Sequence, residues 1–130
     1  MTPYTVSTGD IPTELLSTFY KMRATFERLP DFEDELITCH AICSAFAQHF
    51  NLTCVDGYWG TGNEHSWIIN PKYPKVIIDM YPIGGATPFI IFKHWILPWD
   101  KLYIQKPLEL STQERERQVT KILSAIQLLN

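Results

Sequence analysis

Residues 53–81, TCVDGYWGTGNEHSWIINPKYPKVIIDMY, alternate short runs rich in Val, Ile, Tyr and Trp with short breaks rich in Gly, Asn and Pro. Runs of this composition favour β-strands, and the breaks favour turns. We therefore expect three consecutive strands over Thr53–Trp59, residues 65–70 and residues 75–81. Because both connections are short, an antiparallel meander is the simplest arrangement of these strands.

The flanking segments carry helical patterns instead. Apolar residues recur three and four positions apart in residues 11–29 and again in residues 37–50, where Thr38 is a suitable N-cap and Asn51 a suitable left-handed end. A capping box at residues 111–114 introduces a helix near the C-terminus. Phe89–Phe92 and residues 102–105 are candidates for further short strands. These patterns predict an α+β fold, with an antiparallel sheet of about three to five strands packed against a cysteine-bearing helix and with N- and C-terminal helices.

Length and charge narrow the class of protein. The chain has 130 residues, of which 45% are hydrophobic, so we expect residues 1–130 to form a single domain. Eleven basic and fourteen acidic residues give a net charge of −3 without a basic cluster, which argues against nucleic acid as a partner. The longest apolar runs are far shorter than the roughly 18 residues that span a bilayer, which argues against a membrane. The sequence leaves the oligomeric state open.

Cysteine usage points to a compartment. The chain has three cysteines, an odd number, and residues 1–30 show no basic segment followed by an apolar one, so no secretory leader is expected. Both observations favour a reducing, cytoplasmic location.

Three residues have the order and the spacing of a nucleophile, its base and an orienting acid. Cys39 falls at the expected start of a helix, where the dipole favours a thiolate. A three-residue turn between Asn70 and Pro74 would place His65 directly opposite Asp79, with Cβ atoms roughly 5 Å apart. Asp79 is the only charge in its strand, and a buried carboxylate needs a partner such as the imidazole. The arrangement predicts nucleophilic catalysis.

A family resemblance rests on the same residues. A helix-borne Cys39, the strand end at residues 55–59 (VDGYW), His65-Ser66-Trp67 and the strand at residues 76–79 (VIID) follow one another in residues 36–83. In this order they resemble the transglutaminase-like branch of the papain-like cysteine protease superfold, over a little more than a third of the chain. The resemblance implies a Cys39–His65–Asp79 triad that performs acyl transfer on a peptide, amide or thioester substrate as an amidase, peptidase, thioester hydrolase or transferase, without a cofactor.

The residues around the triad leave alternatives open. Cys43 lies one helical turn beyond Cys39 and is the alternative nucleophile, although the helix dipole acts less strongly there. Cys54 has apolar neighbours and is expected to be a small buried hydrophobe. The backbone N–H of Cys39 is the natural first oxyanion donor. Three aromatic residues that flank the site in sequence are candidates for substrate binding: Trp59, Trp67 and Tyr81.

Two other classes of function are alternatives to a cysteine-dependent enzyme. A zinc site would draw on Cys39, His40, Cys43, His49, Cys54 and His65, but these include only one tightly spaced pair, so we expect no metal. A non-catalytic binding or inhibitor module would act through the aromatic residues of 89–99. Thiol reactivity separates a binding module from an enzyme, because only the enzyme needs a thiolate at neutral pH.

Overall fold

The α+β fold is confirmed by the computed structural model, which describes residues 11–32, 35–60, 62–82, 87–92, 103–108 and 112–129. Three helices are present among these residues: α1 (Thr13–Glu27), α2 (Cys39–His49) and α4 (Thr112–Gln127). Five strands form one antiparallel sheet: β1 (Thr53–Trp59), β2 (Asn63–Ile69), β3 (Val76–Asp79), β4 (Phe89–Phe92) and β5 (Tyr103–Gln105). The C-terminal helix predicted from the capping box is present as α4, although Ser111, the first residue of the box, lies outside the described residues, as do residues 93–99 of the aromatic segment.

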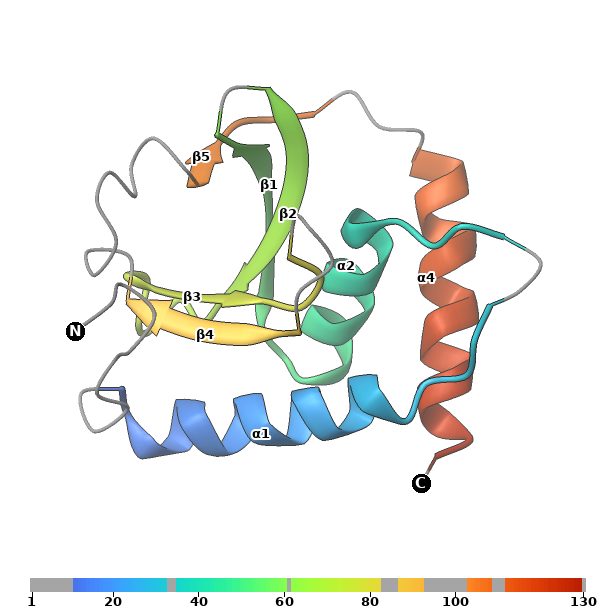
Figure 1. The fold of residues 1–130 in the computed structure, drawn as a ribbon, viewed down its shortest axis with the longest axis horizontal. Helices are drawn as coiled ribbons and strands as arrows, with labels where there is room; N and C mark the ends of the chain where they lie inside the picture. Colours follow the sequence, from blue (N-terminus) through green and yellow to red (C-terminus); the bar gives the residue numbers. More distant parts are fainter. Residues whose placement is uncertain are drawn as a thin grey trace.

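The sheet carries the expected meander at its centre. Its strand order is β4-β3-β2-β1-β5, so the three strands predicted first are consecutive neighbours and the two short strands form the edges. Figure 1 shows the sheet curling, with β1 and β2 running across the direction of β3 and β4. The curl lets the concave side enclose a small cluster of its own. This cluster consists of Val55, Trp67, Ile77, Ile91 and Tyr103.

The predicted register between β2 and β3 is wrong by two residues. Ile68 pairs with Ile78, and continuing this ladder places Trp67, not His65, opposite Asp79. The cause is the connection, which makes two successive turns with hydrogen bonds from Tyr73 N to Asn70 O (2.7 Å) and from Val76 N to Tyr73 O (3.1 Å). A shift of two residues keeps a side chain on the same face of a sheet. His65 and Asp79 therefore remain diagonal neighbours.

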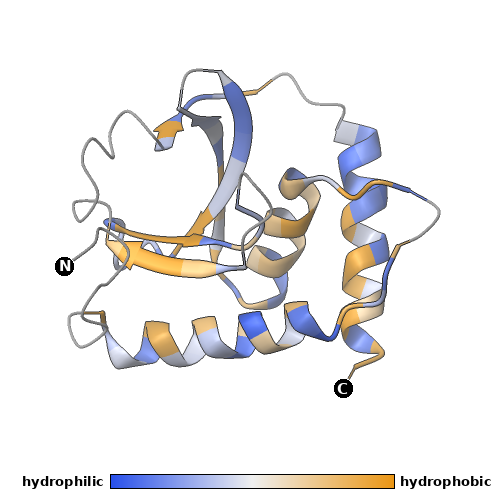
Figure 2. Cartoon of the chain, viewed as in Figure 1, coloured by the Kyte–Doolittle hydropathy of each residue, from blue (hydrophilic) through white to orange (hydrophobic). Residues whose placement is uncertain are grey.

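The main core lies between the other face of the sheet and the helices. α2 contacts β1 and β2 on one side and α4 on the other, and its apolar residues share one cluster with those of α1, β3 and α4. In Figure 2, β4 is hydrophobic from end to end, and β3 is hydrophobic until it reaches Asp79. A carboxylate thus ends β3, a strand whose four residues are all buried.

The ends of α2 agree with the sequence prediction and fix the position of its first residue. Thr38 is the N-cap, and its hydroxyl accepts a hydrogen bond from Ala41 N at 3.2 Å. Asn51, just past the C-terminal end, has a φ of 57°, in the left-handed region that Asn tolerates. Capping by Thr38 makes Cys39 the first residue of the helix.

Gly57 allows the edge strand β5 to approach β1. A Cβ atom at this position would lie 2.0 Å from the backbone oxygen of Ile104 and 2.8 Å from the ring of Trp67. Any side chain would push β5 away, so glycine is needed here for close approach rather than for its backbone angles. The consequence for the site is that Tyr103, on β5, reaches over the concave face.

None of the described helices has both the length and the apolar composition needed to cross a bilayer.

Candidate active site

Cys39 presents its thiol at the N-terminal end of α2. The bonds that cap the helix use the amides of Ala41 and Ile42, which reach the hydroxyl and the carbonyl of Thr38. Neither bond uses the amide of Cys39. The Cys39 residue is partly exposed, as a nucleophile must be.

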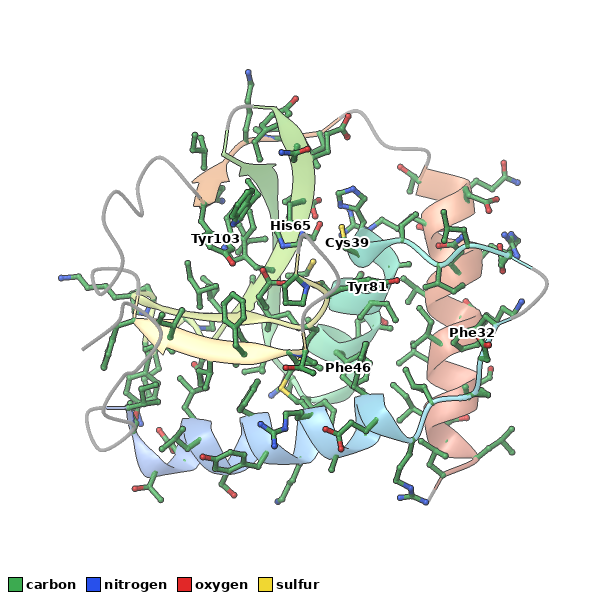
Figure 3. The ribbon with its side chains drawn as sticks, in the orientation of Figure 1. Phe32, Cys39, Phe46, His65, Tyr81 and Tyr103 are labelled. Carbon is green, nitrogen blue, oxygen red and sulfur yellow. The ribbon has the colours of Figure 1, made fainter. Side chains whose placement is uncertain are left out.

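His65 and Asp79 form a fully buried pair beside this thiol. His65 Nε2 donates a hydrogen bond to Asp79 Oδ2 at 2.8 Å, and both side chains have no exposed surface. Because a carboxylate only accepts, this bond places the proton of a neutral imidazole on Nε2 and leaves the lone pair on Nδ1. Figure 3 shows His65 between Tyr103 and Cys39. A neutral His65 therefore offers Nδ1 to the Cys39 proton, and the raised pKa of His65 means that the imidazole then keeps this proton at neutral pH.

Nδ1 of His65 is buried, and no hydrogen bond of good geometry satisfies it within the described part of the chain. Burial alone would lower the pKa of His65, but the hydrogen bond that it donates to Asp79 and the adjacent Cys39 raise that pKa to about 9. Cys39 thus lies close enough to His65 to raise its pKa, although Nδ1 has no hydrogen-bond partner among the described residues.

The raised pKa of His65 predicts a pH-dependent stability. The folded value, about 9, lies above the ordinary value of 6.5, so the protonated imidazole stabilises the fold fully below pH 6.5, and this contribution is lost as the pH rises through 9. Asp79→Asn removes the charge behind this shift. We expect the stability advantage of wild type over Asp79→Asn, measured by urea unfolding, to be clearly larger at pH 6 than at pH 9.5. An advantage that is the same at both values would contradict the ion pair.

Tyr103 is a member of the site that the sequence analysis missed. Its hydroxyl donates to Asp79 Oδ2 at 2.7 Å, and the amide of Tyr81 donates to Asp79 Oδ1 at 3.3 Å. Trp59 in turn hydrogen-bonds to the hydroxyl of Tyr103. Asp79 is thus held by three donors, which keep its carboxylate aimed at His65. The pattern of β5 places Tyr103 inward, but nothing local in the sequence identifies its partner.

A second chain of hydrogen bonds joins α2 to the sheet through His40 and Ser66, the residues that follow Cys39 and His65 in the sequence. His40 Nδ1 lies 2.6 Å from Ser66 Oγ, and Ser66 Oγ donates to Asp56 Oδ1 at 2.7 Å. Arg115 of α4 donates two hydrogen bonds to Asp56, at 2.8 and 2.9 Å. Because the single Ser66 proton goes to Asp56, Ser66 must accept from His40. Burial and the charge of Arg115 lower the pKa of His40, so a neutral imidazole makes this bond.

This chain is expected to hold Cys39 and His65 in place relative to each other, because His40 follows Cys39 on α2 and Ser66 follows His65 on β2. Ser66→Ala should slow acylation of Cys39 by about tenfold, since small displacements of reacting groups are costly. The pH midpoint of the reaction should not move, because the His65–Asp79 bond is intact. Ser124→Ala, an exposed serine on α4, is the control. Equal rates in wild type and Ser66→Ala, with both proteins shown by circular dichroism to be folded, would show that this hydrogen-bonded chain does not position Cys39 and His65.

The other two cysteines are in unreactive environments. Cys43 is fully buried, donates to the Ser66 carbonyl at 3.2 Å, and has a pKa raised well above its usual value by burial. Cys54 is partly buried. It is not a simple hydrophobe, because Arg115 donates a hydrogen bond to its sulfur at 3.4 Å. Burial raises the pKa of the Cys54 thiol to about 12. The geometry favours Cys39 over Cys43 as the nucleophile.

The residues proposed for zinc do not converge. Within residues 11–129, outside the gaps in the description, no three side chains of His, Cys, Asp or Glu are close enough together to hold a metal ion. His40 is bonded to Ser66 instead.

The three aromatic candidates for substrate binding occupy different places. Trp67 is 4% exposed and packs edge-on against Tyr103 in the concave cluster, which leaves little of its indole for a substrate. Trp59 packs against the same cluster and bonds to Tyr103. Tyr81 is exposed and lines a pocket. Contact with substrate stays a prediction for all three.

Comparison of the chain with protein-family models, with characterised proteins and with solved structures finds no significant match. The resemblance to the transglutaminase-like branch therefore stays a prediction.

Proposed function

We propose that this protein is a cysteine-dependent acyl-transfer enzyme with Cys39 as nucleophile, His65 as general base and acid, and Asp79 as the residue that orients His65. The observation that carries the proposal is the fully buried 2.8 Å bond between His65 Nε2 and Asp79 Oδ2, next to a partly exposed thiol at a helix N-terminus. Burying an imidazole–carboxylate pair costs desolvation free energy, and such pairs are enriched at functional sites. The neighbouring Cys39 thiol gives this pair a function as its base.

The proposed reaction has two halves. His65 Nδ1 takes the Cys39 proton, and the thiolate attacks the carbonyl carbon of an amide, peptide or thioester, forming a C–S bond. The tetrahedral oxyanion is stabilised by the Cys39 amide. Collapse breaks the bond to the leaving group, which receives the proton from His65. Water then attacks the thioester, gives its proton to His65, and releases the acid and the Cys39 thiol.

Hydrolysis is the proposed outcome because water is always present as an acceptor. An amine in place of water would make the same acyl-enzyme a transferase. The acyl-enzyme is thus the intermediate that both outcomes share, and it is the species to detect.

Trapping this intermediate tests the proposal. The native protein is incubated with p-nitrophenyl acetate, quenched in acid, and mapped by peptide mass spectrometry. We expect one acetyl group on Cys39, a burst of nitrophenolate equal to the enzyme, and neither in Cys39→Ser. Acetylation that is absent, or that is equal on all three cysteines, would overturn the proposal and favour a binding module. The binding module would act through the aromatic residues of 89–99, of which residues 93–99 lie outside the described part of the chain.

A further inference from the structure

One carboxylate oxygen of the candidate site accepts hydrogen bonds from two side chains. His65 Nε2 donates to Asp79 Oδ2 at 2.8 Å, and the hydroxyl of Tyr103 donates to the same oxygen at 2.7 Å. The other oxygen, Oδ1, accepts from the amide of Tyr81. A carboxylate oxygen has two lone pairs, so His65 and Tyr103 use both lone pairs of Oδ2. The reaction proposed above gives a role to His65 but none to Tyr103.

The surroundings of Tyr103 keep it in the form that donates. The residue is 3% exposed, and burial and the charge of Asp79 raise the pKa of its hydroxyl far above the usual value, so the hydroxyl keeps its proton. The indole of Trp59 is a donor only, and its bond to the Tyr103 hydroxyl polarises that hydroxyl toward Asp79. A chain of donors therefore runs from Trp59 through Tyr103 to the oxygen that His65 uses.

Sharing this oxygen weakens the attraction of Asp79 for the imidazole of His65. A hydrogen bond draws negative charge from the oxygen that accepts it, and less charge then remains to attract a second donor. Because an imidazolium is stabilised by negative charge beside it, a carboxylate that shares its charge stabilises the imidazolium less. In the proposed reaction His65 takes a proton from Cys39 and returns it to the leaving group. A proton held too tightly would be returned slowly.

We propose that Tyr103 is a positioning residue that moderates the proton affinity of His65 by sharing Asp79 Oδ2. This inference rests on the proposed function, in which His65 acts first as a base and then as an acid. In the view of Figure 3, Tyr103 and Cys39 lie on opposite sides of His65, as expected for an effect that passes through Asp79. The three-residue edge strand β5 thereby contributes to the reaction.

The other titratable groups around His65 are unchanged when the Tyr103 hydroxyl is removed. They are Cys39, His40 and Cys43 of α2 and Glu64 of β2. β1 places Gly57, which carries no charge, opposite His65. Tyr103→Phe also keeps the ring that packs edge-on against Trp67, with centroids 5.1 Å apart. A change in the titration of His65 in this variant therefore reports the loss of the bond to Asp79.

The titration of His65 tests the inference directly. We expect the pH midpoint of its imidazole signals, followed by NMR in histidine-labelled protein, to rise by about one pH unit in Tyr103→Phe. Trp59→Phe removes only the polarising donor and should raise the midpoint by less. Tyr73→Phe is the control, because its hydroxyl also donates to a carboxylate, that of exposed Glu14. An unchanged or lower midpoint in Tyr103→Phe, or an equal rise in Tyr73→Phe, would overturn the inference.

Acylation rates should depend on the leaving group. Phenolate is a poorer leaving group than p-nitrophenolate, so it relies more on the proton that His65 supplies as the C–O bond breaks. A His65 that holds its proton about tenfold more tightly should slow the reaction of Tyr103→Phe with phenyl acetate by about threefold more than its reaction with p-nitrophenyl acetate. Equal slowing with both esters would contradict the moderating role of Tyr103.

The same NMR titration in Cys39→Ser separates this inference from the proposed function. This variant lacks the thiol but retains the donors to Asp79 Oδ2. If Tyr103→Phe raises the His65 midpoint in this background while Cys39 of the wild type is not acylated, Tyr103 moderates His65 and the proposed function fails. If Cys39 is acylated but the midpoint does not move, the role of Tyr103 alone is overturned.

Discussion

Asp79→Ala is expected to lower the free energy of unfolding by about 3–5 kcal/mol, the range for breaking a buried charge pair. The substitution removes the acceptor of three hydrogen bonds, from His65, Tyr103 and the amide of Tyr81. Two of the donors are side chains in the buried interior, and leaving them unsatisfied adds to the loss. Urea unfolding at pH 7, followed by tryptophan fluorescence, measures the effect.

Glu14→Ala is the matched control for this prediction. Glu14 accepts from Lys72 at 3.3 Å, but both side chains of that pair are more than half exposed. An exposed pair contributes about 0–1 kcal/mol, so the control should lose little stability. Equal losses in the two variants would contradict the claim that Asp79 anchors a buried network.

His65→Ala should slow acetylation of Cys39 by p-nitrophenyl acetate by about 100- to 1000-fold, within the range for loss of a general base. The reason is that Nδ1 of His65 is the proposed acceptor of the thiol proton. Added imidazole should restore part of the rate by entering the space that the side chain leaves. Stopped-flow measurement of nitrophenolate release gives both rates.

The control for His65→Ala is another histidine in the same protein. His49 is exposed at the C-terminal end of α2, whereas Cys39 lies at the other end of that helix. His49→Ala should keep the rate within about twofold of wild type, as surface substitutions usually do little. Acetylation of His65→Ala at the wild-type rate would remove His65 from the mechanism.

The elements of the fold could be predicted because their signals are local. Apolar spacing marked α1 and α2, and alternation between turn residues marked β1, β2 and β3. The position of Cys39 followed from the cap at Thr38, and the pairing of Asp79 followed from a lone charge in an apolar strand. Each of these inferences used only a few adjacent residues.

The parts that could not be predicted depend on tertiary geometry. The register of β2 with β3 was wrong because the connection makes two turns where the sequence also allows one. Tyr103 was missed because its bond to Asp79 depends on β5 pairing with β1, and that strand is distant in sequence. The His40–Ser66 bond joins residues 26 positions apart, so neither residue signals the other.

The most direct test of the proposed triad is the rate of iodoacetamide labelling at each cysteine of the native protein between pH 5.5 and 9. Peptide mapping would compare wild type, Cys39→Ser and His65→Ala. We predict fast labelling of Cys39 that persists below pH 7 and is slowed in His65→Ala, while buried Cys43 remains unlabelled. Labelling of Cys39 at the rate of an ordinary thiol, unaffected by His65→Ala, would contradict the account.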